Sequence, residues 1–275
     1  MSRWSLADVP WDTFDPTKVD PDIVRIVKAA SMVEINADDY VRYLERVFAQ
    51  DSELLGAISH WGEEEAQHGN ALARWAKLAD PDFDFAAARA AFAAGFRIDT
   101  NVDRSIRGSR TGELVARCIV ETGTSSFYAA LAEATDEPVL RYICRKIAAD
   151  ELRHSKLFYD GAKQYQKSEG ISAWGRLKVA LGRIIESEDD ELAYAYYAAN
   201  GVTDPYERKR WNGEYVVRAY AIYKRSHIDR GMAMVLKAVG LNPTGWLHRA
   251  LSGTAWAFMQ RRVRILGRIR ADAAA

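Results

Sequence analysis

The chain has 275 residues, of which 48% are apolar, and its 38 Lys and Arg residues equal its 38 Asp and Glu residues in number. This composition suits a globular protein with one large domain, or one domain with an appended lobe. Zero net charge gives no overall attraction to nucleic acid, so we expect no nucleic-acid partner.

The only two cysteines, Cys118 and Cys144, exclude a rubredoxin-type centre or a four-thiolate site within the chain, and we expect both to be buried packing thiols. No apolar leader and no run of 18 apolar residues occur, so we expect a cytoplasmic protein without a transmembrane segment.

Helical periodicity starts at Pro21, after an irregular arm over residues 1–19, and continues almost to the end of the chain. Asp51 and Thr111 are predicted helix N-caps, and Pro138 suits the first turn of its helix. We expect helices over about 21–49, from after Asp51 to about 79, over 85–96, over 112–134, and from the Asp136-Glu137-Pro138 start to about 168. Residues 171–275 are predicted to form further helices, broken at Gly201, Asp204-Pro205 and Asn242-Pro243.

Strand-like alternation is essentially absent, so the predicted fold class is all-α. The four long helices are expected to form a four-helix bundle within residues 1–170, which also include the N-terminal arm. Residues 171–275 are expected to complete or flank that bundle and to end in a basic segment. That segment, residues 241–275, holds six arginines against the single acid Asp272.

Acids and histidines interrupt the apolar stripe of each long helix. Apolar residues recur every three or four positions in these helices, as on the buried face of a bundle. The polar interruptions are Glu34, Glu65, His68, Glu121, Glu151 and His154. An uncompensated carboxylate in a dry core costs several kcal/mol. Two divalent cations remove this cost, because four carboxylates balance the charge of two such ions.

The spacing within the helices supports the same conclusion. Glu65 and His68, like Glu151 and His154, are three residues apart and so project from one helix face. Two lone glutamates plus two Glu-x-x-His pairs match the known ligand arrangement of di-iron and di-manganese carboxylate bundles. Oxygen and imidazole ligands without thiolate fit iron or manganese, and we expect two Fe ions, with Mn as the alternative.

An acid stands directly before each glutamate of the two Glu-x-x-His pairs. A metal-bound imidazole usually donates its other N–H to a carboxylate, which fixes the orientation of the ring. We therefore expect Asp150 to orient His68 and Glu64 to orient His154; the alternative is that both acids are surface residues.

Two runs resemble the motifs of the soluble acyl-carrier-protein (ACP) desaturases of the ferritin-like superfamily. Trp61–Leu72, WGEEEAQHGNAL, resembles that family's W-x-x-E-E-x-x-H-G-[DN]-x-L, and Ile147–His154, IAADELRH, resembles its I-A-A-D-E-x-R-H. Tyr40 also matches the family pattern, whereas Gln67 stands where the family has a basic residue, and little matches beyond residue 170.

The resemblance implies a ferritin-like bundle with a di-iron site, an O2-dependent desaturase activity on a fatty acyl chain, and an external electron donor such as ferredoxin. Thr124 falls where the family carries a threonine beside the oxygen-binding side of the metals, so it is the candidate catalytic residue. The family also has an N-terminal tryptophan on its electron path, for which Trp4 and Trp11 are candidates. The acyl carrier stays open between ACP, coenzyme A and a lipid, and a homodimer is expected by analogy.

Other functions of the superfamily stay open. They include a di-iron hydroxylase or oxygenase on another apolar substrate and a ferritin-like iron-binding or ferroxidase protein. A rubrerythrin-like peroxidase would have a glutamate at the position of Thr124, which counts against that class. An N-oxygenase of the type with a third histidine would have that histidine at the position of Ile147, which counts against the second class. The basic, aromatic segment around Trp246, His248 and Trp256 is expected to be a solvated helix end. Contact with an acidic carrier protein or an anionic membrane is the alternative.

Overall fold

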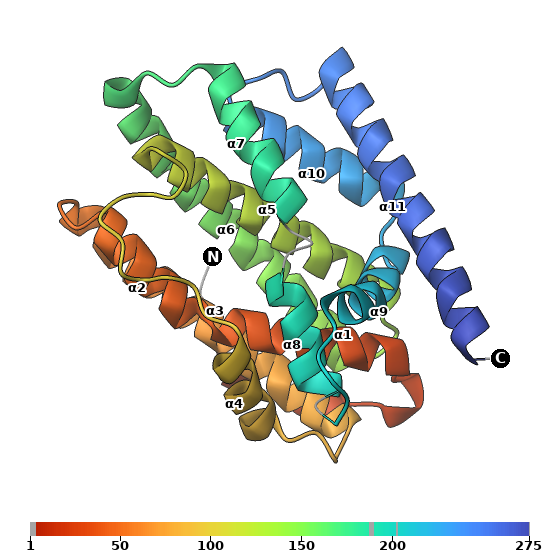
Figure 1. Ribbon diagram of the computed structural model, residues 1–275. Coiled ribbons are helices and arrows are strands. Elements are labelled where there is room, and N and C mark those ends of the chain that lie inside the picture. Colours follow the sequence, from red (N-terminus) through yellow and green to blue (C-terminus); the bar gives the residue numbers. More distant parts are fainter. Residues whose placement is uncertain (1–3, 187–189, 202, 275) are drawn as a thin grey trace.

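A computed structural model describes residues 4–186, 190–201 and 203–274. The regular structure of these residues is entirely helical, and the predicted all-α class is confirmed. After three short 3₁₀ turns in the N-terminal arm, the α-helices are α1 (Pro21–Ile35), α2 (Ala37–Val47), α3 (Ser52–Ala79), α4 (Phe85–Gly95), α5 (Arg110–Ala134), α6 (Pro138–Glu169), α7 (Ala173–Ile185), α8 (Asp190–Asn200), α9 (Arg208–Ala221), α10 (Arg225–Ala238) and α11 (Trp246–Ala274) (Figure 1).

The centre of the molecule is a bundle of the four helices α1, α3, α5 and α6 (Figure 1). α5 packs extensively on α6, α1 packs on α3, and α3 contacts α6, which joins the two pairs. α2 continues beyond α1 along the same helix, α3. This arrangement is the predicted ferritin-like four-helix bundle, with the additional C-terminal helices around it.

Two apolar clusters fill the bundle, one on each side of a polar layer. On α3, Ile58 belongs to one cluster and Trp75 to the other, with Glu65 and His68 between them in the sequence. The other long helices repeat this order: Leu114, Glu121 and Leu131 on α5; Ile147, Glu151 and Phe158 on α6. The dry clusters therefore hold the helices together above and below the polar layer, which is closed off from water on both sides.

The predicted single helix over 21–49 is wrong, because the structure divides it into α1 and α2 at Asn36. The backbone N–H of Asn36 donates to the carbonyl of Val33, a tighter turn than that of the α-helix. The break follows a close contact between α1 and α3, where Ile35 lies against Gly69. No proline or glycine stands near Asn36, so local sequence signals could not reveal this break.

The remaining helices of the bundle agree with the prediction apart from one cap. The Asp51 side chain accepts a hydrogen bond from the Leu54 N–H, as expected of an N-cap, and α6 begins with Pro138. The predicted cap of α5 is wrong: Ser109 accepts from the Gly112 N–H, and Thr111 lies buried inside the helix. Serine and threonine are similar N-cap residues, so sequence alone could not choose between them. Cys118 and Cys144 are buried free thiols, as predicted.

The C-terminal helices surround the bundle. α8 packs on α1, and α9 packs on α8; α7 and α10 pack on α5, and α11 covers α9 and α10. The predicted breaks are confirmed, since α8 ends at Asn200, α9 begins at Arg208 and α11 begins at Trp246. The division into two parts at about residue 170 stays a prediction. Within the described residues, no helix combines the length and apolar character needed to cross a bilayer.

Gly69 offers a test of the close approach between α1 and α3. A methyl group there would lie 2.8 Å from the backbone nitrogen of Ile35 and 3.1 Å from its Cα. Because backbone atoms cannot yield without moving a whole helix, we expect Gly69→Ala to lower the free energy of unfolding by about 1–3 kcal/mol in chemical denaturation.

The matched control is Gly56→Ala on the same helix, where an added Cβ meets nothing within 4 Å. This change should raise the free energy of unfolding by about 0.5–1 kcal/mol, because alanine favours the helix interior. Equal effects of the two substitutions would contradict the close contact.

Candidate metal centre

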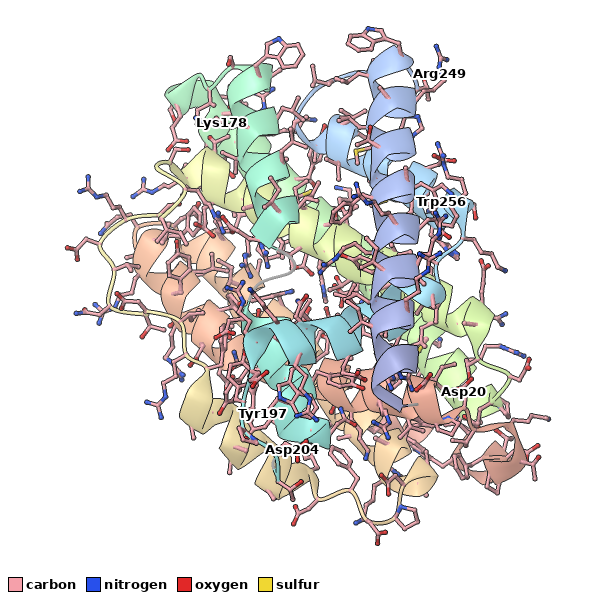
Figure 2. All side chains as sticks on the ribbon, turned by 45° about the vertical axis from the view of Figure 1, so that its right-hand side comes forward. Asp20, Lys178, Tyr197, Asp204, Arg249 and Trp256 are labelled. Carbon is pink, nitrogen blue, oxygen red and sulfur yellow. The ribbon has the colours of Figure 1, made fainter. Side chains whose placement is uncertain are left out.

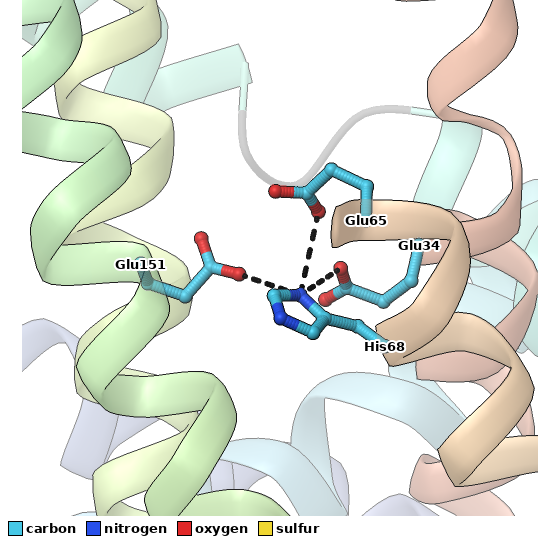
Figure 3. A group of neighbouring side chains, drawn as sticks. All are labelled: Glu34, Glu65, His68 and Glu151. Atoms are coloured by element: carbon cyan, nitrogen blue, oxygen red, sulfur yellow. Dashed lines mark ion pairs between the residues drawn. The ribbon is translucent and has the colours of Figure 1, made fainter. Parts of the chain in front are cut away.

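Six side chains from α1, α3, α5 and α6 meet in the polar layer of the bundle. The first group surrounds Nδ1 of His68, which lies 3.3 Å from Glu151 Oε1, 3.6 Å from Glu34 Oε2 and 3.9 Å from Glu65 Oε2 (Figure 3). All four side chains are buried, and their ligand atoms lie within 4.8 Å of one another. This spacing is small enough for one metal ion to bind all of them.

The second group surrounds Nδ1 of His154. This atom lies 2.9 Å from Glu65 Oε1, 3.6 Å from Glu121 Oε2 and 3.8 Å from Glu151 Oε2. The four ligand atoms again lie within 4.8 Å of one another. The structure thus brings together all six residues that the sequence predicts as ligands, although their role in metal binding stays a prediction.

The two groups share Glu65 and Glu151. Each of these glutamates offers one carboxylate oxygen to the His68 group and the other oxygen to the His154 group. Glu34 belongs to the first group alone, and Glu121 to the second alone. Each group of four residues could hold one ion, with Glu65 and Glu151 available to both ions, a division that the sequence pattern does not reveal.

Four buried atoms at the centre of this arrangement lack a hydrogen-bond partner among the described residues. They are Glu65 Oε1, His68 Nδ1, Glu151 Oε1 and His154 Nδ1. Each nitrogen is close to several carboxylate oxygens but is not aligned with any of them as a hydrogen-bond donor should be. Leaving such groups unsatisfied costs about 1–3 kcal/mol each, and more if they are charged. Metal ions placed among these atoms would satisfy them together, so the residues present fit a pair of divalent cations.

The outer nitrogen of each histidine contacts a carboxylate. His68 Nε2 lies 3.1 Å from Asp150 Oδ2, and His154 Nε2 lies 2.8 Å from Glu64 Oε2. These are the two pairs expected from the sequence. With Nε2 held in this way, Nδ1 of each ring is left to face the centre of the site.

Arg153 was not predicted to take part, but its guanidinium joins the two outer carboxylates. It donates to Asp150 Oδ1 and, at 3.2 Å, to Glu64 Oε1. Because it donates to both acids, it links the carboxylate that contacts His68 to the carboxylate that contacts His154. The signal was present in the sequence, since Arg153 lies within the IAADELRH run.

Trp4 contacts both Asp150 and His68 from the N-terminal arm. Its indole Nε1 donates to Asp150 Oδ2 at 2.7 Å, and its ring stacks on His68 with an interplanar angle of 7°. Trp11, the other candidate, instead donates to the Leu6 carbonyl and lies under Arg74. Of the two N-terminal tryptophans, only Trp4 contacts residues of the site.

Two hydroxyl groups donate to ligand glutamates. The hydroxyl of the buried Tyr128 donates to Glu34 Oε1, and Thr124 Oγ1 donates to Glu151 Oε2 at 2.8 Å. The sequence placed Tyr128 in the apolar stripe of its helix but could not reveal its polar contact. Tyr40, by contrast, donates to Glu191 Oε2 at 2.7 Å and is not part of either group.

The four carboxyl groups differ in pKa. Burial and the nearby Glu65 raise the pKa of Glu34 well above its usual value, and burial and Glu151 do the same for Glu121. Burial also opposes the ionisation of Glu65 and Glu151, but the adjacent imidazoles of His154 and His68 outweigh it and lower both pKa values. Burial and neighbouring carboxylates thus favour the protonated form of Glu34 and Glu121, whereas the imidazoles favour the ionised form of Glu65 and Glu151.

The two imidazoles are strongly basic for the opposite reason. Burial alone would lower the pKa of His68, but the Asp150, Glu151 and Glu34 carboxylates raise it well above its usual value. Glu121 and Glu151 raise the pKa of His154 in the same way against the effect of burial. Neighbouring carboxylates thus favour the protonated form of both imidazoles.

Known proteins offer little further guidance on this site. No protein-family model and no characterised protein sequence matches the chain. Among solved structures, the chain is similar to the one named "putative acyl-ACP desaturase DesA2 from Mycobacterium tuberculosis H37Rv". The match covers 92% of this chain and 90% of that chain, with 18% sequence identity and a TM-score of 0.47. The name agrees with the family that the two motifs resemble, but a match of this quality carries no weight for activity.

The pKa directions predict that metal binding displaces protons. Metal ions would bind the unprotonated side chains, so we expect protons to be released from the groups whose pKa is raised, Glu34, Glu121, His68 and His154. Because these pKa values are raised in the metal-free protein, the apparent metal affinity should fall steeply as the pH falls. Titration of the metal-free protein with Fe(II) under anaerobic conditions, in weakly buffered solution, measures the protons directly.

Glu34→Gln provides the matched control, since it removes one carboxyl group with a raised pKa and should reduce the number of protons released. Metal binding without proton release would show that the side chains are not paired as described.

Proposed function

We propose that this chain is an O2-dependent di-iron oxidoreductase, and that it desaturates a fatty acyl chain. The observation that supports this most is the pair of four-residue groups that share Glu65 and Glu151 inside a dry bundle. Two iron ions bound there would supply O2-dependent oxidation of an unactivated C–H bond. The ligand set of carboxylates and imidazoles fits iron best, with manganese as the alternative.

The residues around the ligands would keep the site rigid and dry. Tyr128 fixes the orientation of Glu34, and Asp150, Glu64 and Arg153 fix the two imidazoles. The apolar clusters on both sides exclude water, which protects a reactive centre from side reactions. Such a setting suits an apolar substrate.

Thr124 is proposed to hold a proton for the reacting oxygen. Its hydroxyl donates to Glu151 at 2.8 Å and lies within 3.2 Å of the carbonyl oxygens of Val120 and Glu121, so its position is fixed.

Electrons are proposed to enter through Trp4, Asp150 and His68. These three side chains form a continuous line of contacts from the surface to a ligand of the site. A surface cavity of about 240 Å³ reaches Trp4 and Asp150 and is otherwise lined by His60, Glu63, Glu64 and Gln67. An external donor such as ferredoxin would deliver the two electrons of each turnover there. ACP is proposed as the carrier of the acyl chain.

The activity can be tested by analysing the lipids of cells that express the protein. We expect new unsaturated fatty acids with the unaltered chain and none with Glu151→Ala, which removes a ligand shared by both groups. Glu53→Gln, an exposed acid on the same helix as Glu65 but outside the cavity, should behave like the unaltered protein. Hydroxylated rather than unsaturated acids would favour the hydroxylase alternative, and an unchanged lipid profile would refute the acyl substrate.

The electron path predicts a separate effect of Trp4. Trp4→Phe removes the hydrogen bond to Asp150 but leaves all six predicted ligands, so the iron content should stay the same. Reduction of the iron by a protein donor should slow by at least about tenfold, while reduction by dithionite, a small reagent, should not change. Stopped-flow absorbance of the iron centre measures both rates.

Trp11→Phe is the control, because Trp11 does not contact the site. Equal rates for both variants with the protein donor would contradict the proposed path.

A further inference from the structure

The exposed large apolar side chains are concentrated on two helices. Eight such residues occur among those described, and only Leu78 and Ile106 lie elsewhere. The other six belong to α7 and α11: Trp174, Ile185, Trp246, Phe258, Ile265 and Ile269. Trp174 is 64% exposed and Trp246 is 71% exposed, which is unusual for the largest apolar side chain. We call these two helix surfaces the α7–α11 face.

The same two helices are strongly basic. α7 carries three bases and no acid, and α11 carries six arginines and no acid as far as Arg270. Exposed apolar groups and positive charge therefore occur together on this face. In the rest of a zero-charge protein, by contrast, acids and bases are mixed.

The exposed side chains of α11 follow one side of the helix. Trp246, Phe258, Arg261, Ile265 and Arg268 are exposed, and their positions fall within about 120° of one another around the helix. The opposite side carries the buried and half-buried residues Ser252, Met259 and Leu266 and packs on α9 and α10. The helix is thus amphipathic, with an outer surface that mixes arginines with aromatic and branched apolar groups.

α7 carries a similar line of exposed residues. Trp174, Lys178 and Ile185 are exposed and are spaced by four and seven residues, so they share one side of the helix. In Figure 2, Lys178 is labelled on α7, and Arg249 and Trp256 are labelled on α11, which lies in front. Both helices begin at the same end of the molecule (Figure 1).

We propose that the α7–α11 face binds the surface of an anionic lipid bilayer. Arginine and lysine would contact acidic headgroups, while the tryptophan, phenylalanine and isoleucine side chains would enter the boundary between headgroups and acyl chains. Tryptophan prefers this boundary because its ring is apolar and its N–H is polar. The 29 residues of α11 span about 43 Å, long enough for several contacts along a flat surface.

Charge and shape favour a bilayer over protein partners. A second copy of the chain would bring two acid-free basic faces together, and these would repel each other. An acidic protein would satisfy the arginines, but it would need apolar pockets for six large side chains spread over two helices. A fluid bilayer accepts such side chains without a matching shape.

Sedimentation with lipid vesicles tests the proposal on the full-length, iron-loaded chain. We expect binding to vesicles of equal parts phosphatidylglycerol and phosphatidylcholine, little binding to pure phosphatidylcholine, and release at high salt. The double variant Trp174→Ser, Trp246→Ser and the triple variant Arg261→Gln, Arg264→Gln, Arg268→Gln should each lower the bound fraction by about fivefold or more.

Leu78→Ser with Ile106→Ser is the matched control, because it removes the two exposed apolar side chains that lie elsewhere, and binding should not change. Circular dichroism of each variant verifies that it is folded. The proposal is overturned if the unaltered chain does not bind anionic vesicles, or if both α7–α11 variants bind as well as the control. It is also overturned if the face binds purified acyl carrier protein but not the vesicles. None of these results depends on the metal site.

Discussion

The structure depends on the neutralisation of four buried carboxylates and two buried imidazoles by charges within their own group. The six side chains are buried between two apolar clusters of the bundle, so water cannot stabilise them. In the metal-free chain, these carboxyl and imidazole groups shift one another's pKa values; two divalent cations would instead balance the charge of the four carboxylates. Four atoms at the centre of this layer have no hydrogen-bond partner among the described residues, and bound cations would satisfy all of them.

Residues around the site hold its helices and its outer carboxylates in position. α1 ends at Ile35, one residue after Glu34, where Gly69 allows the two helices to approach. Arg153 ties the two outer carboxylates together, and Trp4 anchors the N-terminal arm to one of them. A site of this kind is therefore held from several directions, and the loss of one contact should leave the others in place.

The positions of the six predicted ligands could be read from the sequence because each interrupts an apolar stripe with helical spacing. The pairing of Asp150 with His68 and of Glu64 with His154 also followed from their place before each ligand glutamate. What could not be predicted depends on how helices pack. The break at Asn36 occurs where α1 lies close to α3, and the sharing of Glu65 and Glu151 between the two groups depends on which carboxylates face each other across the bundle. The same holds for Tyr128, whose spacing fits a core residue and whose hydroxyl contact is visible only in three dimensions.

Anomalous X-ray scattering at the iron absorption edge, from crystals of the iron-loaded chain, tests the central claim most directly. We predict two peaks about 3.5–4 Å apart, one next to Nδ1 of His68 and one next to Nδ1 of His154, with Glu65 and Glu151 in contact with both. A folded chain with no peak in this layer, in which the histidines bond to the glutamates instead, would contradict the account.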